Sequence, residues 1–223
     1  MDEGFWQARW ERNQIGFHRQ DVNPGLIKHW PSLQVAQGSC VFVPLCGKSL
    51  DLCWLAEQGY SVLAVELIEK AVVDFFAEQQ LSPSISQQGS FTRYSAGCIT
   101  ILCGDFFALT AEDLADVDVF YDRAALVALP EELRRNYAAH LSKQLPQGCK
   151  GLLLTLYYPQ AEMKGPPFSV PPKQVQELFA DTFTLERIGE HDVLGQEWRY
   201  KDVGVTYLYE YVYRVEHRKT SKT

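Results

Sequence analysis

Residues 40–66 read CVFVPLCGKSLDLCWLAEQGYSVLAVE. The run Cys40–Val43 is short, apolar and rich in β-branched residues, which is typical of a buried strand. A polar loop follows it, and the apolar spacing over residues 50–56 then indicates a helix. Residues 62–65 repeat the strand pattern, and the strand closes on Glu66. This stretch therefore predicts a strand, a loop, a helix and a second strand parallel to the first.

The same alternation of strands and helices continues along the rest of the chain. Five more strands are predicted, at residues 99–102, 117–121, 152–156, 182–185 and 206–213. Helices are predicted between them, at residues 68–80, 130–145 and 173–179. Strands that are apolar on both faces and separated by helices indicate a parallel sheet with helices on each side. The last strand alternates polar and aromatic residues, so we expect an α/β fold with a seven-stranded, mostly parallel sheet and one antiparallel strand near its edge.

Length and composition favour one compact domain. The chain has 223 residues, of which 46% are hydrophobic and 22% charged, and this is enough apolar material for a single core. We expect one domain over residues 1–223, made of an N-terminal lid segment (1–38), a core (39–216) and a mobile tail (217–223). Nothing in the pattern suggests an oligomer, so a monomer is expected.

Charge and termini exclude several classes of protein. A formal net charge of -7 argues against a basic face that binds nucleic acid or an anionic membrane. The chain begins MDEGFW, which lacks the positive charge and apolar run of a signal peptide, and no apolar run approaches the roughly 20 residues that span a bilayer. A cytoplasmic protein is expected. Its six cysteines form no C-x-x-C pair, so we expect buried free thiols and no metal site.

The ends of the strands are where a ligand is expected. In open parallel sheets the binding crevice lies beyond the carboxyl ends of the strands. Glu66 closes the second strand about 20 residues after the first glycine-containing loop, a spacing at which an acid reaches the hydroxyls of a ribose. The alternative is a solvated glutamate at a strand end. The order of strand, loop, helix and strand around Glu66 favours the ribose interpretation.

The loop before the first predicted helix narrows the choice of ligand. Residues 44–49 contain one glycine, Gly47, so the G-x-G-x-x-G pattern of a dinucleotide site is missing. A nucleoside-triphosphate loop would need a glycine at position 42, which is Phe42. A nucleoside ligand without phosphates fits both observations. S-adenosyl-L-methionine (AdoMet) is a common cofactor of that description, so a methyltransferase is indicated.

Two further strand ends carry candidate side chains. Asp105 is placed to bond the amino group of an adenine, with Phe106 against the ring; the alternative is that Asp105 caps the following helix. Arg123 would be a fixed cation in the crevice, and the alternative is a structural ion pair with Asp122.

Large aromatic residues gather before the first strand. Phe5, Trp6, Trp10 and Phe17 precede the sheet, with Trp30 further on. We expect a lid that closes over the cofactor and lines an apolar pocket, although a helix that simply packs on the domain is the alternative. His18 follows Phe17 and is interpreted as a hydrogen-bonded structural group rather than a general base.

Several of these segments together resemble a known family. They are Phe5-Trp6-x-x-x-Trp10, Gly16-Phe17-His18, Val43-Pro44-Leu45-Cys46-Gly47-Lys48-Ser49, Val65-Glu66, Asp122-Arg123-x-Ala125-Leu126-Val127-Ala128 and Gly165-Pro166-Pro167-Phe168. The chain resembles the thiopurine S-methyltransferase family in its bacterial form over nearly its whole length. The resemblance implies a Rossmann-like class I methyltransferase fold. It also implies transfer of the methyl group of AdoMet to the sulfur of aromatic and heterocyclic thiols.

The resemblance also assigns roles to particular residues. It implies cofactor contacts from Trp6, Trp10, Leu45, Glu66, Asp105, Phe106 and Arg123. The acceptor would be lined by Phe17, Pro166, Pro167 and Phe168. For catalysis, Arg123 would favour the thiolate, and Asp21 or a water would take the proton. Animal members carry a second substrate arginine, and whether Arg199 corresponds to it is left open.

Three other functions remain open at this point. The first is methyl transfer to another soft acceptor, such as a selenium or tellurium species. The second is a nucleotide-dependent oxidoreductase, which the missing glycines disfavour. The third is a module that binds AdoMet without turnover.

Overall fold

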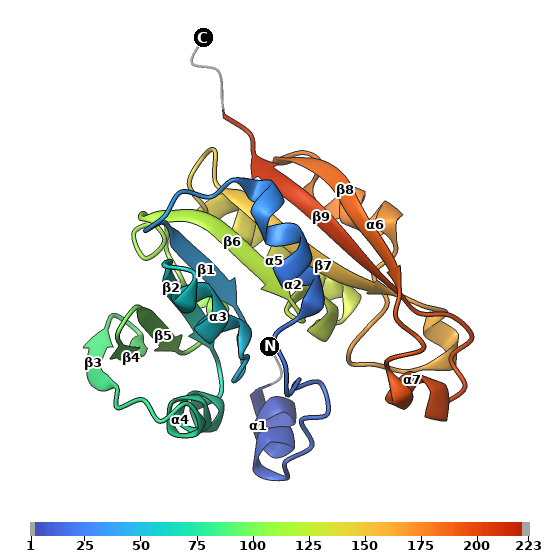
Figure 1. Ribbon diagram of the computed structural model, residues 1–223, viewed down its shortest axis with the longest axis horizontal. Helices are drawn as coiled ribbons and strands as arrows, with labels where there is room; N and C mark the ends of the chain where they lie inside the picture. Colours follow the sequence, from blue (N-terminus) through green and yellow to red (C-terminus); the bar gives the residue numbers. More distant parts are fainter. Residues whose placement is uncertain (1–2, 220–223) are drawn as a thin grey trace.

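A computed structural model describes residues 3–219 (Figure 1). The strands of this part of the chain form one nine-stranded sheet in the order β3-β4-β5-β2-β1-β6-β7-β9-β8. They are β1 (Cys40–Pro44), β2 (Ser61–Glu66), β3 (Ser84–Gln88), β4 (Phe91–Ala96), β5 (Ile99–Cys103), β6 (Val117–Arg123), β7 (Lys150–Tyr157), β8 (Phe183–Asp192) and β9 (Tyr209–His217). The α-helices are α1 (Glu3–Glu11), α2 (Pro24–His29), α3 (Asp51–Glu57), α4 (Glu69–Glu78), α5 (Glu131–Gln144), α6 (Pro172–Phe179) and α7 (Trp198–Asp202).

The predicted seven strands are present, and the central five run parallel. β5, β2, β1, β6 and β7 pair in parallel, and β9 inserts antiparallel between β7 and β8. The expected antiparallel strand near the edge is thereby confirmed. The strand count is wrong, because β3 and β4 add an antiparallel hairpin beyond β5. β3 is polar and largely exposed, so it carries no apolar pattern that would mark it as a strand.

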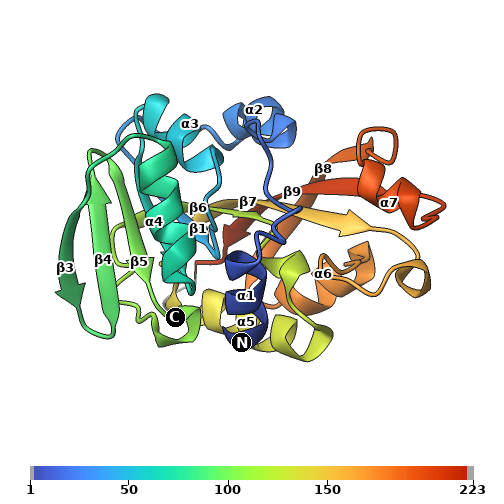
Figure 2. The same cartoon turned by 90° about the horizontal axis from the view of Figure 1, so that it is seen from below.

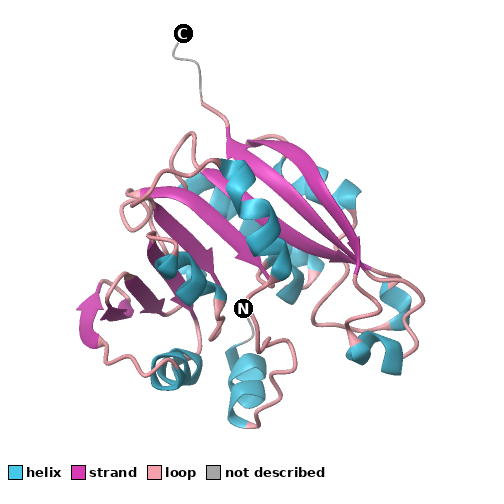
Figure 3. Ribbon diagram, viewed as in Figure 1, coloured by secondary structure: helices cyan, strands magenta, loops and turns pink. Residues whose placement is uncertain are grey.

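Helices cover the two faces of the sheet (Figures 2 and 3), and a hydrophobic cluster lies on each face. Helices α2, α3 and α4 cover one face through Leu26, Leu52 and Phe75, which belong to one buried cluster. Helices α5 and α6 cover the other face through Tyr137 and Val175. Each layer removes a large apolar area from water, which is the main stabilising contribution to such a fold.

The predicted lid segment divides into two structural parts. Leu26 in α2 and Trp30 and Leu33 in the 3-10 helix η1 (Trp30–Leu33) are buried in the core cluster. They pack against the sheet as permanent core. α1 instead packs on α4, where Trp10 contacts Ile68 and Ala71. We therefore propose that the covering role is restricted to residues 3–22.

The C-terminal end of the described chain is bound to the sheet. His217, predicted in the tail, is the last residue of β9, and its Nε2 lies 2.9 Å from the carbonyl oxygen of Ser142. The Arg218 N–H donates to the carbonyl of Thr182 at 2.9 Å. The remaining predicted tail residues 220–223 lie outside the described residues.

Two further observations concern the whole described chain. Over residues 3–219, no helix is long and apolar enough to cross a bilayer. The six cysteines are free, but only Cys46 and Cys149 are buried and Cys98 is exposed, so the expectation of buried thiols holds only in part.

Candidate functional site

A cavity of about 740 Å³ lies at the carboxyl ends of the parallel strands. Residues on or after β2, β1, β6 and β7 line it, together with Glu210 at the start of β9. The N-terminal segment and the loop between β8 and β9 form its cover. The structure brings together most of the predicted site residues there: Trp6, Trp10, Phe17, Asp21, Leu45, Glu66, Arg123, Pro166 and Pro167.

The loop after β1 forms the floor of one end of the cavity. Leu45 has φ +48° and Gly47 has φ +54°, so the chain turns sharply where β1 ends. A Cβ on Gly47 would lie 3.3 Å from the Trp10 ring. The absence of a side chain there allows the indole to lie directly over the loop.

Glu66 joins the ends of β1 and β2. Its Oε2 accepts a hydrogen bond from the Gly47 N–H at 2.8 Å, and its Oε1 accepts one from the Ile68 N–H at 2.9 Å. Burial raises the pKa of Glu66, and these backbone donors act against that shift. Each carboxylate oxygen keeps a second lone pair, so the group can still accept hydrogen bonds from a ligand in the cavity.

Aromatic rings cover this end of the cavity. The ring of Phe17 lies 5.7 Å from that of Trp6 and 6.0 Å from that of Trp10, both nearly perpendicular to it. Edge-to-face packing of aromatic rings stabilises such a cluster by more than the burial of its apolar area alone. The N-terminal segment is therefore held by its own aromatic cluster and by its contact with α4.

Arg123 ends β6 in the middle of the cavity. Ala124, which follows it, has φ +68° and turns the chain away at this point. Asp122 is fully buried and accepts from the Tyr137 hydroxyl at 2.7 Å and from the Leu126 N–H at 3.2 Å. Successive strand residues point to opposite faces, so Arg123 and Asp122 diverge. Among the described residues Arg123 has no salt-bridge partner, which contradicts the structural ion-pair alternative.

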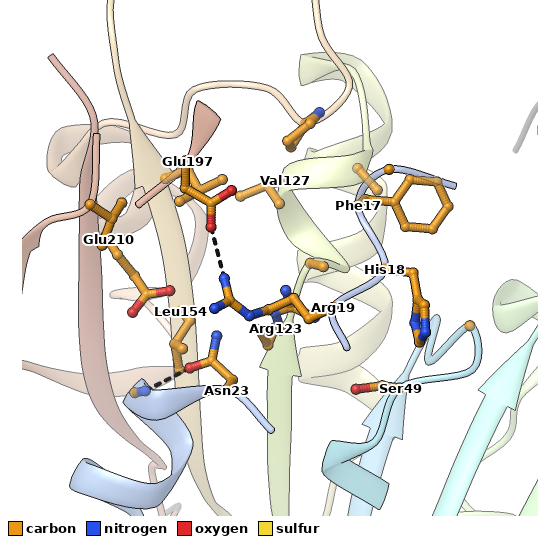
Figure 4. A pocket seen from close by; sticks show the side chains of 18 of the residues that line it. Phe17, His18, Arg19, Asn23, Ser49, Arg123, Val127, Leu154, Glu197 and Glu210 are labelled. Atoms are coloured by element: carbon orange, nitrogen blue, oxygen red, sulfur yellow. Dashed lines mark hydrogen bonds and ion pairs between the residues drawn. The ribbon is translucent and has the colours of Figure 1, made fainter. Parts of the chain in front are cut away.

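The opposite end of the cavity holds charged residues that the sequence analysis did not identify. Arg19 Nη1 lies 2.7 Å from Glu197 Oε1, and this ion pair joins the N-terminal segment to the loop after β8 (Figure 4). Asn23 caps α2 by accepting from the Gly25 N–H at 2.7 Å. Glu210 points toward the same space. This end is therefore polar and closed by one long-range contact.

His18 and Arg199 both line the cavity. Burial, followed by the charge of Lys48, lowers the pKa of His18. Within residues 3–219 no hydrogen bond to its imidazole is found, so the prediction of a hydrogen-bonded structural group is not supported. The Arg199 guanidinium lies beside Gly16, where a Cβ would be 3.1 Å from it. Arg199 therefore reaches the cover of the cavity.

Three predicted site residues are not among those that line the cavity. Asp105 is exposed and caps the short helix η2 (Phe106–Ala108), accepting from the Phe107 N–H at 3.1 Å. Phe106 is buried in the core, with its ring 4.7 Å from that of Tyr137. The Phe168 ring lies over Gly165, and the guanidinium carbon of Arg134 lies 5.6 Å from the centre of that ring. The Phe106 ring is therefore corrected to a core position, and Asp105 caps the helix as its alternative interpretation had it; ligand contacts of Asp105 and Phe168 stay predictions.

Phe106→Ala is expected to destabilise the fold. The substitution removes a fully packed core ring, so the free energy of unfolding should fall by about 3–5 kcal/mol. Denaturant unfolding of the variant measures this loss. If the variant retains wild-type stability and loses only ligand binding, the corrected placement of Phe106 is contradicted.

The comparison with known sequences gives the family. The family model described as thiopurine S-methyltransferase matches residues 1–218. The chain belongs to the thiopurine S-methyltransferase family. A relative of that name from Azotobacter vinelandii is 55% identical over 98% of this chain and 100% of its own length. One from Pseudomonas fluorescens is 53% identical, with 100% of both chains covered.

Solved structures agree with the family on the fold. A Burkholderia thailandensis 1,6-didemethyltoxoflavin-N1-methyltransferase, solved with 1,6-didemethyltoxoflavin and S-adenosylhomocysteine bound, has a TM-score of 0.66 at 14% identity. The match covers 97% of this chain and 87% of that one. An Anabaena variabilis AdoMet-dependent methyltransferase has a TM-score of 0.63 at 13% identity, covering 97% and 95%. The structure is a class I methyltransferase fold to which the β3–β4 hairpin is added.

Proposed function

We propose that this chain transfers the methyl group of AdoMet to the sulfur of aromatic and heterocyclic thiols of the thiopurine kind. Membership of the thiopurine S-methyltransferase family supports the reaction class. The observation that carries the proposal in this structure is one continuous cavity with Glu66 at one end and Arg123 in the middle. Such a cavity accommodates a nucleoside cofactor and a small acceptor side by side.

The residues at the Glu66 end fit AdoMet. A buried carboxylate at the end of β2 matches the two hydroxyls of a ribose, and the chain there offers no glycine-rich cradle for phosphates. Trp10 and Leu45 line the same end and supply apolar contact. We propose that Glu66, Leu45, Trp6 and Trp10 hold the cofactor. When bound, AdoMet supplies a methyl group that its sulfonium has already activated.

Arg123 and the aromatic cover account for the acceptor chemistry. Within residues 3–219 the Arg123 guanidinium is in no ion pair, and it would favour the thiolate over the neutral thiol, because it stabilises the negative charge on sulfur. When this sulfur is held in line with the methyl group, most of the entropic cost of bringing the two reacting atoms together has already been met by binding. The covering segment excludes water from the reacting atoms. The chain thus acts mainly by alignment and charge, and Phe17, Pro166 and Pro167 form the apolar wall for the acceptor ring.

Two measurements test this proposal together. Isothermal titration with S-adenosylhomocysteine should show one binding site, and assays with 6-mercaptopurine and AdoMet should show S-methylated product. Binding without turnover over a panel of aromatic thiols would contradict an S-methyltransferase and favour a binding module. Preferential turnover of selenite-derived species would contradict the thiol acceptor.

Phe17→Ala is expected to weaken acceptor binding selectively. Loss of one apolar wall should raise KM for aromatic thiols roughly 10-fold, which corresponds to the burial energy of part of a ring. Steady-state kinetics at saturating AdoMet measure the change. An increase confined to the KM for AdoMet would show that Phe17 belongs to the cofactor end instead.

A further inference from the structure

Glu210 lies at the polar end of the cavity, on the same face of the sheet as Arg123. In the strand register Arg123 stands opposite Leu154 of β7, and Glu210 stands opposite Leu156. Residues two apart on a strand share a face, so Arg123 and Glu210 project to the same side from strands separated only by β7. A Cβ on Gly25 would lie 2.9 Å from Glu210 Oε1. The carboxylate therefore rests against the first turn of α2, in space that a larger residue would fill.

The surroundings of Glu210 differ from those of the other carboxylates in the cavity. Burial raises its pKa, while Arg123, a hydrogen bond with Asn23 and Arg19 act in the opposite direction and Glu197 adds to the increase. The charged and titratable groups that line the cavity on the elements around it are Arg123 on β6, Arg19, Glu197 and Arg199 in the covering segments, Lys28 on α2, and Glu190, His191 and Asp192 on β8. It is thus a half-buried acid with two arginines and a second carboxylate nearby.

We propose that Glu210 is the base that takes the proton from the acceptor thiol, an inference that rests on the proposed function. The S–H bond of the thiol breaks, and its proton goes to a carboxylate oxygen of Glu210. The sulfur electron pair forms the new bond to the methyl carbon, while the bond from that carbon to the cofactor's sulfonium breaks and its electron pair stays on the cofactor's sulfur. The proton then leaves Glu210 for water when the cover opens.

Position and partial burial favour Glu210 over Glu66 and Asp21. Glu66 uses both oxygens to hold backbone N–H groups at the far end of the cavity. Asp21 is exposed to water. A base works best when its pKa approaches the working pH, and burial shifts a carboxylate in that direction. Arg123 and Glu210 would then share the task, with Arg123 attracting the thiolate and Glu210 holding the proton.

The experiment compares Glu210→Gln with wild type on two aromatic thiols of similar size. One thiol has a pKa well above the assay pH and arrives neutral, and the other has a pKa well below it and arrives as thiolate. For the neutral thiol kcat/KM should fall roughly 100-fold, and for the thiolate it should change less than about threefold. Glu216→Gln, an exposed residue on the same strand, is the matched control and should change neither value.

Any other outcome for the Glu210 variant would overturn the inference, and one outcome for the wild type would contradict the proposed function. Equal losses for both thiols would show that Glu210 only shapes the site, and equal retention would show that it does nothing. A selective loss in Asp21→Asn with none in Glu210→Gln would assign the base to Asp21. Absence of thiol turnover by the wild type would contradict the proposed function. Because this is measured on the wild type, it is distinguished from any effect of the Glu210 variants.

The wild-type pH profile gives a second measurement that does not depend on a variant's folding. The carboxylate must be deprotonated to act, so kcat/KM for the neutral thiol should fall as pH decreases through the raised pKa of Glu210. The midpoint of this decrease should lie above the usual pKa range of a glutamate side chain. The decrease should be absent for the thiol that arrives as thiolate. A flat profile for the neutral thiol would overturn the inference.

Discussion

Glu66→Ala is expected to weaken S-adenosylhomocysteine binding by about 3 kcal/mol, because hydrogen bonds from two ribose hydroxyls to a carboxylate are lost. The corresponding increase in Kd is roughly 150-fold. The variant also leaves the Gly47 and Ile68 N–H groups without the acceptor that holds the loop after β1. Isothermal titration of wild type and variant measures the change.

The control for this prediction is Glu57→Ala, an exposed acid at the end of α3. It changes the net charge by the same amount and should leave Kd unchanged. If Glu66→Ala binds S-adenosylhomocysteine as tightly as wild type, the cofactor end of the cavity has been wrongly assigned.

Arg123→Ala is expected to lower kcat for aromatic thiols roughly 100- to 1,000-fold, the usual cost of removing one preorganised charge from a reacting centre. The reason is that Arg123 ends β6 in the middle of the cavity, where its positive charge would stabilise the thiolate. The assay is run at saturating AdoMet, so any weaker cofactor binding does not enter the result.

Arg123→Lys should recover part of this loss, because it keeps a positive charge without the planar guanidinium. Arg135→Ala, on the exposed side of α5, should behave as wild type. Unchanged turnover in Arg123→Ala would show that alignment alone drives the reaction.

The parts of the fold that follow from buried apolar runs were predictable from the sequence. The strands at Cys40–Pro44 and Ser61–Glu66 were found because both of their faces are covered, which gives continuous apolar runs. The β3–β4 hairpin was missed for the opposite reason. Ser84–Gln88 lies at the edge of the sheet, and solvent replaces the second layer that would have required an apolar pattern.

The candidate site also contains residues that the sequence predicts and one that it does not. Glu66 and Arg123 stand directly at strand ends, where the rule for parallel sheets identifies them. Glu210 begins an antiparallel strand, to which that rule gives no position, and it lies between Tyr209 and Tyr211 as an apparent surface residue. Its placement between β7 and β8 was the missing information. An acid between two tyrosines near the start of a strand was the signal that could have revealed it.

Phe106 shows that a position just after a strand end does not by itself place a side chain in a binding site. Its position after a strand end suggested contact with a ligand, yet the short helix that Asp105 caps turns the ring into the core. Whether a side chain at such a corner faces inward or outward depends on one turn of backbone. Single-sequence patterns do not specify that turn.

The position of β9 between β7 and β8 also has a consequence for the protein during its synthesis. β8 leaves the ribosome before β9, but its backbone pairs only with β9 among the strands of residues 3–219. Until residues 209–217 emerge, β8 has no partner and β7 has an open edge, which is a template for wrong pairing. Chains cut after residue 208 should therefore aggregate as nascent products, and the cavity wall that carries Glu210 is assembled among the last parts of the molecule.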